Sequence, residues 1–318
     1  MTTQSSLKGD DIDPQIRAFV ERACADFRAL AGPDPLTMDR MREISEQARK
    51  AWTLGGPDMA QTLMVRVGAG ERRARIHIPA AGAGKGTLIY LHGGGWSVFS
   101  IDTHDRLMRE YAERIGCAVI GLDYSLSPEN RFPTALNDVD QCHDWVLSAG
   151  ESLGLETGHV VIGGDSAGAN LALASTLRRR DEGRFMPDGL LLNYAALETD
   201  HYPSNDRYDG APYMLDVSEM KIFWKNYLGA ESTENPYARP LLADLAELPP
   251  VHLCIAECDI LRDENLELER RLEAAGVHVS AHLYKGATHS FLEAVGVSSC
   301  AERAVQVGAD WVSDLFSR

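Results

Sequence analysis

The sequence predicts an α/β protein with a mostly parallel central sheet of about eight strands and helices on both faces. From residue 87 onward, short apolar runs alternate with helical patterns, as in parallel sheets whose strands are buried on both faces. One run, 160–163, leads through Gly164-Asp165-Ser166-Ala167-Gly168 directly into a helical pattern. A strand, a sharp turn with a serine at its apex and a helix therefore stand at the centre of the predicted fold.

The sequence shows no internal repeat, low-complexity tract or long linker, so we expect one domain over residues 1–318. The chain is 44% hydrophobic and 25% charged, and its net charge of −16 argues against nucleic acid or an anionic membrane as partner. No apolar run is long enough to span a bilayer. The first eleven residues are polar and lack the apolar core of a signal peptide, so we expect a cytoplasmic protein. A homodimer is an assembly that the sequence leaves open.

The cysteines predict reduced thiols. The six are scattered and mostly lie inside apolar segments: Cys24, Cys117, Cys142, Cys254, Cys258 and Cys300. Such spacing is not a disulfide framework, and no second pair accompanies Cys254 and Cys258 to make a zinc site. We therefore expect no bound metal.

Two amphipathic helices, at 12–30 and 38–54, precede the first strand. Two extended segments follow at 62–67 and 72–78, and Gly68-Ala69-Gly70 fits the hairpin between them. The remaining strands are expected at 88–91, 118–124, 160–163, 190–194, 251–256 and 279–284. The remaining helices are expected at 104–115, 134–149, 167–180, 216–228, 263–275 and 299–316.

The segment from about 200 to 240 interrupts this alternation. It is rich in Tyr, Pro, Asn and Asp, and it contains the amphipathic helix expected at 216–228. Because it lies between two sheet strands, it fits a lid over the carboxyl edge of the sheet. A plain surface excursion fits the sequence equally well.

A serine at such a turn needs a base to remove its proton, and that base is oriented by a carboxylate. Five histidines follow Ser166, at His201, His252, His278, His282 and His289. His289 follows the last predicted strand in a loop, where its side chain can reach over the sheet edge. It is the predicted base, against the alternative of a structural histidine.

The orienting acid is predicted to be Asp259. It is the first carboxylate clearly outside the strand at 251–256. Asp263 is the alternative, although it resembles a first-turn helix residue, whose charge favours the helix dipole. The predicted chain order, serine then acid then histidine, is that of α/β-type serine hydrolases.

An oxyanion formed at the serine needs backbone N–H donors already in place. The glycine-rich stretch His92-Gly93-Gly94-Gly95-Trp96 follows the third predicted strand. We expect the donors to be the N–H groups of Gly94, Gly95 and Ala167. The alternative is a glycine-rich turn without a catalytic role.

Together these motifs resemble the hormone-sensitive-lipase branch of the α/β hydrolases, and closely the bacterial acetyl esterases. The resemblance covers nearly the whole chain. It rests on His92–Trp96, 102–106, 123–129, 132–138, 164–168, 259–264 and 289–291. One departure is Ile260, where many relatives carry proline, and it leaves Asp259 in place.

The resemblance implies an α/β-hydrolase fold with Ser166, Asp259 and His289 as catalytic triad. It also implies a helical cap built from about 1–55 and about 200–235, no cofactor, and a small ester substrate with a short acyl chain, from acetyl to about hexanoyl. Bulky side chains are predicted as walls of the substrate pocket: Trp96, Tyr213, Phe223, Trp224 and Phe291.

The predicted activity is that of a serine carboxylesterase working through an acyl-enzyme. Two other functions remain open. The same triad could cleave an amide or a sugar acetate, as an amidase or deacetylase does. The fold could also serve as a non-catalytic receptor, although serine, acid and histidine are all present.

Overall fold

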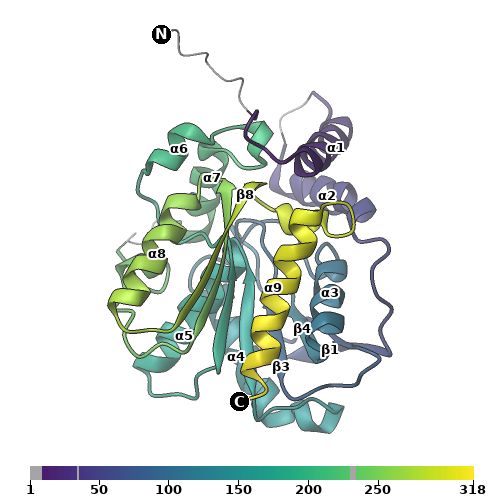
Figure 1. Cartoon of the computed structure of the whole chain (residues 1–318), viewed down its shortest axis with the longest axis vertical. Helices are drawn as coiled ribbons and strands as arrows, with labels where there is room; N and C mark the ends of the chain where they lie inside the picture. Colours follow the sequence, from purple (N-terminus) through teal and green to yellow (C-terminus); the bar gives the residue numbers. More distant parts are fainter. Residues whose placement is uncertain (1–8, 34–35, 230–233) are drawn as a thin grey trace.

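The computed structural model describes residues 9–33, 36–229 and 234–318 (Figure 1). Its sheet has eight strands in the order β1-β2-β4-β3-β5-β6-β7-β8. The strands are β1 (Gln61–Val67), β2 (Arg72–Ile78), β3 (Thr87–Leu91), β4 (Ala118–Leu122), β5 (Val160–Asp165), β6 (Gly189–Asn193), β7 (Val251–Cys258) and β8 (Val279–Thr288). Only the pairings that involve β1 and β2 are antiparallel among these strands, so the predicted α/β class with a mostly parallel sheet is confirmed.

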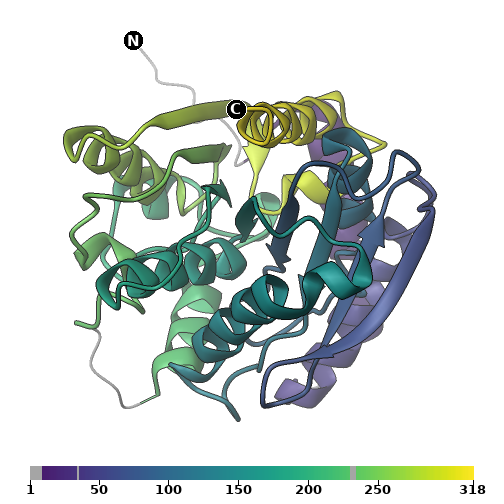
Figure 2. The same cartoon turned by 90° about the horizontal axis from the view of Figure 1, so that it is seen from below.

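Helices cover both faces of the sheet (Figures 1 and 2). The helices are α1 (Pro14–Ala31), α2 (Met38–Arg49), α3 (Asp105–Ile115), α4 (Thr134–Ala149), α5 (Ala167–Asp181), α6 (Pro203–Arg207), α7 (Val217–Leu228), α8 (Arg262–Ala274) and α9 (Ser299–Leu315). Short 3₁₀ turns lie at Lys50–Trp52, Gly150–Leu153, Ala211–Tyr213, Pro240–Leu242 and Phe291–Ala294. Helices α3 and α9 pack together on one face, α4 and α5 on the other, and α8 packs beside β7 and β8. No helix in the described ranges is long and apolar enough to cross a membrane.

Four helices, α1, α2, α6 and α7, lie at one end of the sheet (Figure 1). The start of α1 is fixed by Asp13, whose Oδ1 accepts from the N–H of Gln15 at 2.9 Å, a standard N-cap. The N–H of Asp13 itself donates to the Gly286 carbonyl in β8 at 2.9 Å. The first helix is therefore anchored to the last strand of the sheet.

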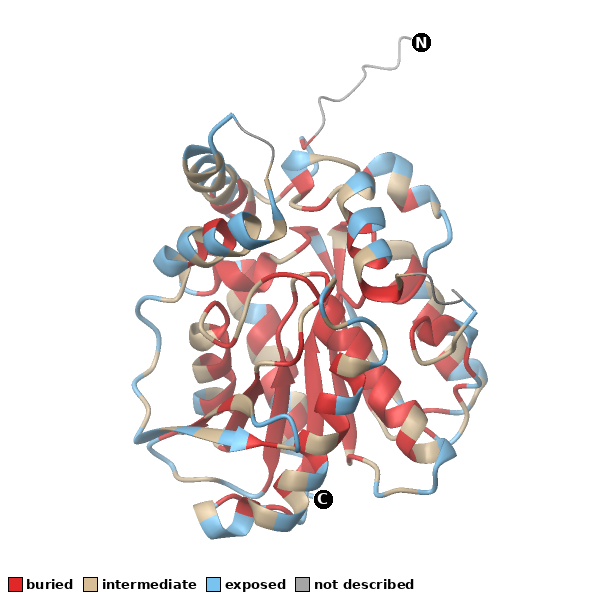
Figure 3. Cartoon of the chain, turned by 180° about the vertical axis from the view of Figure 1, so that it is seen from behind, coloured by how far each residue is buried: buried red, intermediate tan, exposed pale blue. Residues whose placement is uncertain are grey.

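The centre of the sheet forms the core. Every residue of β3, β4, β5 and β6 is buried, and Figure 3 shows buried residues concentrated in the strands. This burial on both faces explains why these strands read as continuous apolar runs rather than alternating ones.

One strand is longer than predicted, and the difference matters for the site. Strand β8 continues past the expected end at 284 to Thr288, because the ladder with β7 resumes at Cys258 after a register shift. His289 is therefore placed directly by a strand, not by a loop as expected. The short helix α6 was not predicted.

Candidate active site

Ser166 occupies the turn between β5 and α5 with φ 53° and ψ −116°. This backbone is unusual for a residue with a side chain, and the surrounding chain holds it in place. The Ser166 N–H donates to the Asn193 carbonyl at 2.9 Å, and its carbonyl accepts from Ala196 N–H at 3.2 Å. A Cβ at Gly168 would collide with the Leu91 carbonyl oxygen of β3, so the close approach of helix and sheet requires glycine there.

His289 and Asp259 lie at the ends of neighbouring strands. The His289 Nδ1 atom lies 2.8 Å from Asp259 Oδ2, and both residues are buried. The second carboxylate oxygen of Asp259 accepts from Leu261 N–H at 3.0 Å. Because both oxygens are engaged, Asp259 is fixed in an orientation that favours a proton on Nδ1 and leaves Nε2 to act as a base.

The alternative acid, Asp263, has different contacts. It lies in the first turn of α8, where its Oδ2 accepts from Ser204 N–H at 2.8 Å and its Oδ1 pairs with Arg262 at 2.7 Å. The structure thus brings Asp259, and not Asp263, to His289.

Ser166 and His289 border one cavity of about 310 Å³. No hydrogen bond joins Ser166 Oγ to His289 Nε2 in the described part of the chain. Catalytic hydrogen bonds are often long in free enzymes and shorten when substrate binds, so this arrangement is compatible with a serine–histidine pair.

The glycine loop after β3 borders the same cavity through Gly94 and Gly95. Both adopt positive φ, 108° and 56°. Neither N–H donates a hydrogen bond to any described residue, so both remain available to a ligand. Ala167, the third expected donor, is the first residue of α5, where the helix dipole adds positive potential.

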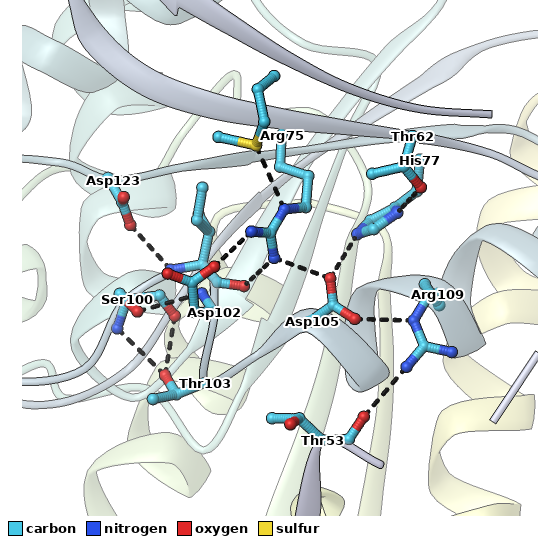
Figure 4. A network of polar contacts seen from close by, with 12 residues as sticks. Thr53, Thr62, Arg75, His77, Ser100, Asp102, Thr103, Asp105, Arg109 and Asp123 are labelled. Carbon is cyan, nitrogen blue, oxygen red and sulfur yellow. Dashed lines mark hydrogen bonds and ion pairs between the residues drawn. The ribbon is translucent and has the colours of Figure 1, made fainter. Parts of the chain in front are cut away.

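A polar network holds the segment after this loop (Figure 4). Asp105 Oδ1 lies 2.8 Å from Arg75 of β2, and its Oδ2 lies 2.8 Å from Arg109. Burial alone would raise the pKa of Asp105, but hydrogen bonds from His77 and Arg109 outweigh it and hold the pKa well below its usual value. Asp123 Oδ1 accepts from Ile101 N–H at 2.8 Å. The 102–106 motif therefore anchors the glycine loop to the sheet.

A second network lies buried beneath Ser166. His104 Nε2 is 3.4 Å from Asp165 and 3.3 Å from Glu293, and Arg49 is 3.2 Å from Glu293. Burial would lower the pKa of His104, but the charges of Asp165 and Glu293 outweigh it and raise the pKa. The pKa of Asp165 is correspondingly lowered by His104, despite the opposing effect of burial. His104 and the Tyr90 hydroxyl, which donates to Asp165 Oδ1 at 3.1 Å, thus stabilise the carboxylate next to Ser166.

The cavity walls are largely apolar and come from distant parts of the chain. Apart from Ser166, His289 and the glycines, they include Phe27, Met41, Arg49, Phe99, Met214, Glu219, Met220 and Phe223. Residues of α1, α2 and α7 therefore lie around the serine. The rest of the expected cap ranges falls partly on 1–8, 34–35 and 230–233, which lie outside the described residues.

Four of the five aromatic residues predicted as pocket walls do not line this cavity, and Phe223 does. Trp96 is fully buried and stacks on Tyr227 with ring centroids 4.3 Å apart, and it also packs on Trp224 at 4.5 Å. Tyr213 accepts from Gly9 N–H, and Phe291 packs beneath Tyr194. The prediction that these four side chains line the substrate pocket is therefore corrected: they are buried and pack against other side chains instead.

Two cavity residues, Arg49 and Glu219, were not singled out from the sequence. Arg49 follows Met41 and Ser45 at spacings of four, so the three share one face of α2. The sequence shows this spacing, but an arginine at such a position is equally typical of a helix face exposed to solvent.

The cysteines and the other potential metal ligands of the described residues form no disulfide and no metal site. All six cysteines are free. Within residues 9–33, 36–229 and 234–318, no group of three or more His, Cys, Asp or Glu side chains could hold a metal ion.

Comparisons with known proteins agree with this geometry. A family model described as the alpha/beta hydrolase fold matches residues 88–293. An α/β hydrolase enzyme from the metagenome of Lake Arreo, Spain, is 28% identical with a TM-score of 0.89, over 97% of this chain and 99% of that chain. An esterase of Pyrobaculum calidifontis is 29% identical with a TM-score of 0.88, over 96% and 99%. The thermostable carboxylesterase EstE1, cloned from a metagenomic library, is 28% identical with a TM-score of 0.84, over 88% and 98%.

Proposed function

Since the chain belongs to the α/β-hydrolase fold family, in its hormone-sensitive-lipase branch, and is a carboxylic ester hydrolase, we propose that it cleaves small esters through an acyl-enzyme on Ser166. The observation that carries this proposal is the 2.8 Å contact between His289 and Asp259 at the border of the cavity that Ser166 also lines. It supplies the base and the group that orients it.

In the proposed reaction, His289 Nε2 takes the proton from Ser166 as its Oγ attacks the ester carbonyl. The carbonyl oxygen becomes an oxyanion that accepts hydrogen bonds from the N–H groups of Gly94, Gly95 and Ala167. His289 then returns the proton to the leaving alcohol, and Ser166 stays acylated. Water, activated by His289, releases the acid in the same two steps.

The contribution of each group follows from general magnitudes. A positioned general base supplies roughly 10²–10⁴ in rate, and one oxyanion donor about 10²–10³. Asp259 holds the imidazole in the required tautomer and stabilises the imidazolium without taking the proton.

The acyl group is proposed to be short. The cavity of about 310 Å³ lies at the small end of the range for ligand pockets, and Phe223 stands against the glycine loop. We further propose that α1, α2 and α6–α7, within about 1–55 and 200–235, act as the cap over this cavity.

Hydrolysis of p-nitrophenyl esters tests the proposal. Purified wild-type protein is expected to hydrolyse the butyrate, and Ser166→Ala to lose the activity while keeping its circular dichroism spectrum and melting temperature. Hydrolysis by the pure variant at the wild-type rate would refute the role of Ser166. Turnover of the matched anilide distinguishes an esterase from an amidase.

A further inference from the structure

The first turn of α7 places a carboxyl group in the cavity wall. Glu219 borders the same cavity as Ser166 and His289, and it lies one turn before Phe223 on the same helix. Asp216 is the N-cap of α7, with its Oδ1 2.7 Å from the Glu219 N–H. At this position a glutamate commonly completes a capping box by accepting from the N-cap N–H. The Glu219 carboxylate makes no such bond, so helix capping does not account for it.

No described residue neutralises this carboxylate. The Glu219 carboxylate oxygens form no hydrogen bond or ion pair within the described residues. The cavity walls include the apolar side chains of Phe27, Met41 and Met214, which offer no partner either. Burial, followed by the charge of Asp216, raises the pKa of Glu219 to about 7, and the nearby His289 lowers it only in part. An unpaired carboxylate in apolar surroundings costs free energy, and a cationic ligand would recover that cost.

The other charged groups at the cavity do not remove this effect. They are Arg28, Arg49, Asp216 and His289, together with the Cys24 thiol. Arg49 lies 3.2 Å from Glu293, and Arg28, which lines the cavity, is exposed and forms no ion pair with Glu219. Asp216 has the same sign as Glu219. The poorly solvated charge without a partner in this cavity is therefore that of Glu219, whereas Arg28 is solvated.

We propose that Glu219 is a specificity-determining residue that selects esters in which the arm lying against α7, either the acyl or the alcohol portion, carries a cationic ammonium group. This inference rests on the proposed esterase function and names the class of ester. A site with an unpaired charge rejects analogues that cannot pair with it more strongly than an apolar pocket rejects a change in size. Esters with a carboxylate at the same place are disfavoured, because two like charges would share one poorly solvated site.

Matched substrates measure this selection on each arm. On the acyl side they are p-nitrophenyl hexanoate and its analogues with a terminal amine or a terminal carboxyl group. On the alcohol side they are the acetate esters of choline and of its uncharged isostere, dimethylbutanol. At pH 8.5, we expect wild-type kcat/KM to favour the cationic over the anionic or neutral partner by about tenfold on one of the two arms.

The variants and the pH dependence identify the group responsible. Glu219→Gln should bring the ratio close to one, and Glu219→Asp should preserve its sign. Wild type should lose the preference below pH 6, where Glu219 is protonated. Glu43→Gln, which removes an equal charge from an exposed position on α2, should keep the wild-type ratio.

The outcomes separate the two proposals. If wild type and Glu219→Gln show the same ratio, or if the carboxylate ester is preferred, the role of Glu219 is wrong while the esterase assignment stands. If wild type hydrolyses none of the esters, charged or uncharged, the proposed function itself is wrong. The ratio is measured within each variant, so a general loss of active protein does not change it.

Discussion

The guanidinium of Arg49 lies 3.2 Å from the carboxylate of Glu293, and both side chains are almost completely buried. Arg49 is the last residue of α2, whereas Glu293 follows His289 by one short turn. The same guanidinium lies 4.6 Å above the Phe99 ring, close to the glycine loop. One side chain from the N-terminal helices thus contacts both the segment after His289 and the segment after the glycine loop.

Arg49→Met is expected to destabilise the protein by about 3 kcal/mol, because it removes the guanidinium from the buried Glu293 and leaves only His104 as a basic neighbour among the described residues. Urea unfolding measures the change. Arg40→Met is the control on the same helix, since the Arg40 guanidinium makes only exposed contacts, with Glu43 and with the Leu30 carbonyl, and its loss should cost under about 1 kcal/mol. Adding Glu293→Gln to Arg49→Met should recover part of the loss. Equal effects of Arg49→Met and Arg40→Met would show that the buried pair contributes nothing.

Asp259→Asn is expected to lower kcat about 10⁴-fold with little change in KM, because an amide cannot hold the Nδ1–H tautomer of His289. Steady-state kinetics on p-nitrophenyl butyrate measures both constants. Asp263→Asn is the matched control and should stay within a few-fold of wild type, since Asp263 pairs with Arg262 and Ser204. A larger kcat loss in Asp263→Asn than in Asp259→Asn would reverse the assignment of the acid.

Phe223→Ala is expected to shift the preferred acyl chain towards longer esters. The Phe223 ring lies against Gly95, where a Cβ would collide with it, so the ring limits the space beside the glycine loop. Trp224→Ala removes the neighbouring side chain, which packs on Trp96 outside the cavity. It should cost about 3–5 kcal/mol of stability and leave the chain-length profile unchanged. An unchanged profile in Phe223→Ala would exclude this role.

Stability is expected to fall as the pH drops below about 6.5. Burial lowers the pKa of His92 to about 4 and those of His143 and His252 to about 3. Between these values and 6.5, the unfolded chain binds three protons that the folded protein excludes. The stability due to the neutral rings is therefore present above pH 6.5 and is lost on acidification. The three rings alone account for up to about 4 kcal/mol per pH unit, and proton uptake by Glu219 and Glu264 in the folded protein, whose pKa values burial raises, offsets part of this loss.

Urea unfolding at pH 7.5, 6 and 5 measures this slope. His252→Phe should lower the slope by about 1.4 kcal/mol per pH unit, since one of the three histidines that take up protons only on unfolding is removed. His201→Gln, an exposed control, should leave it unchanged. A wild-type stability that is flat from pH 7.5 to 5 would contradict the account.

Much of the fold could be predicted from the sequence because its patterns are local. The buried runs of β3 to β6 and the glycines beside Ser166 each reflect a constraint within a few residues. His289 and Asp259 could be named from their places after strands, since the parallel strands of one sheet end at the same edge.

The cavity walls could not be predicted in the same way. Whether Phe223 or Trp224 faces the cavity depends on how α7 packs against the sheet, and adjacent helix positions differ by about 100° in direction. The pair of Arg49 and Glu293 joins residues from opposite ends of the chain, so no local pattern indicates it. The length of β8 was missed because Gly286 resembles a turn, while pairing with β7 carries the strand past it.

Labelling of Ser166 tests the central claim most directly. Wild type is incubated with a p-nitrophenyl alkylphosphonate, and the released p-nitrophenol is counted against the protein. The account predicts one equivalent released, complete loss of esterase activity, and the phosphonate found by peptide mass spectrometry on Ser166. Labelling at another residue, or full inactivation with Ser166 unmodified, would contradict it.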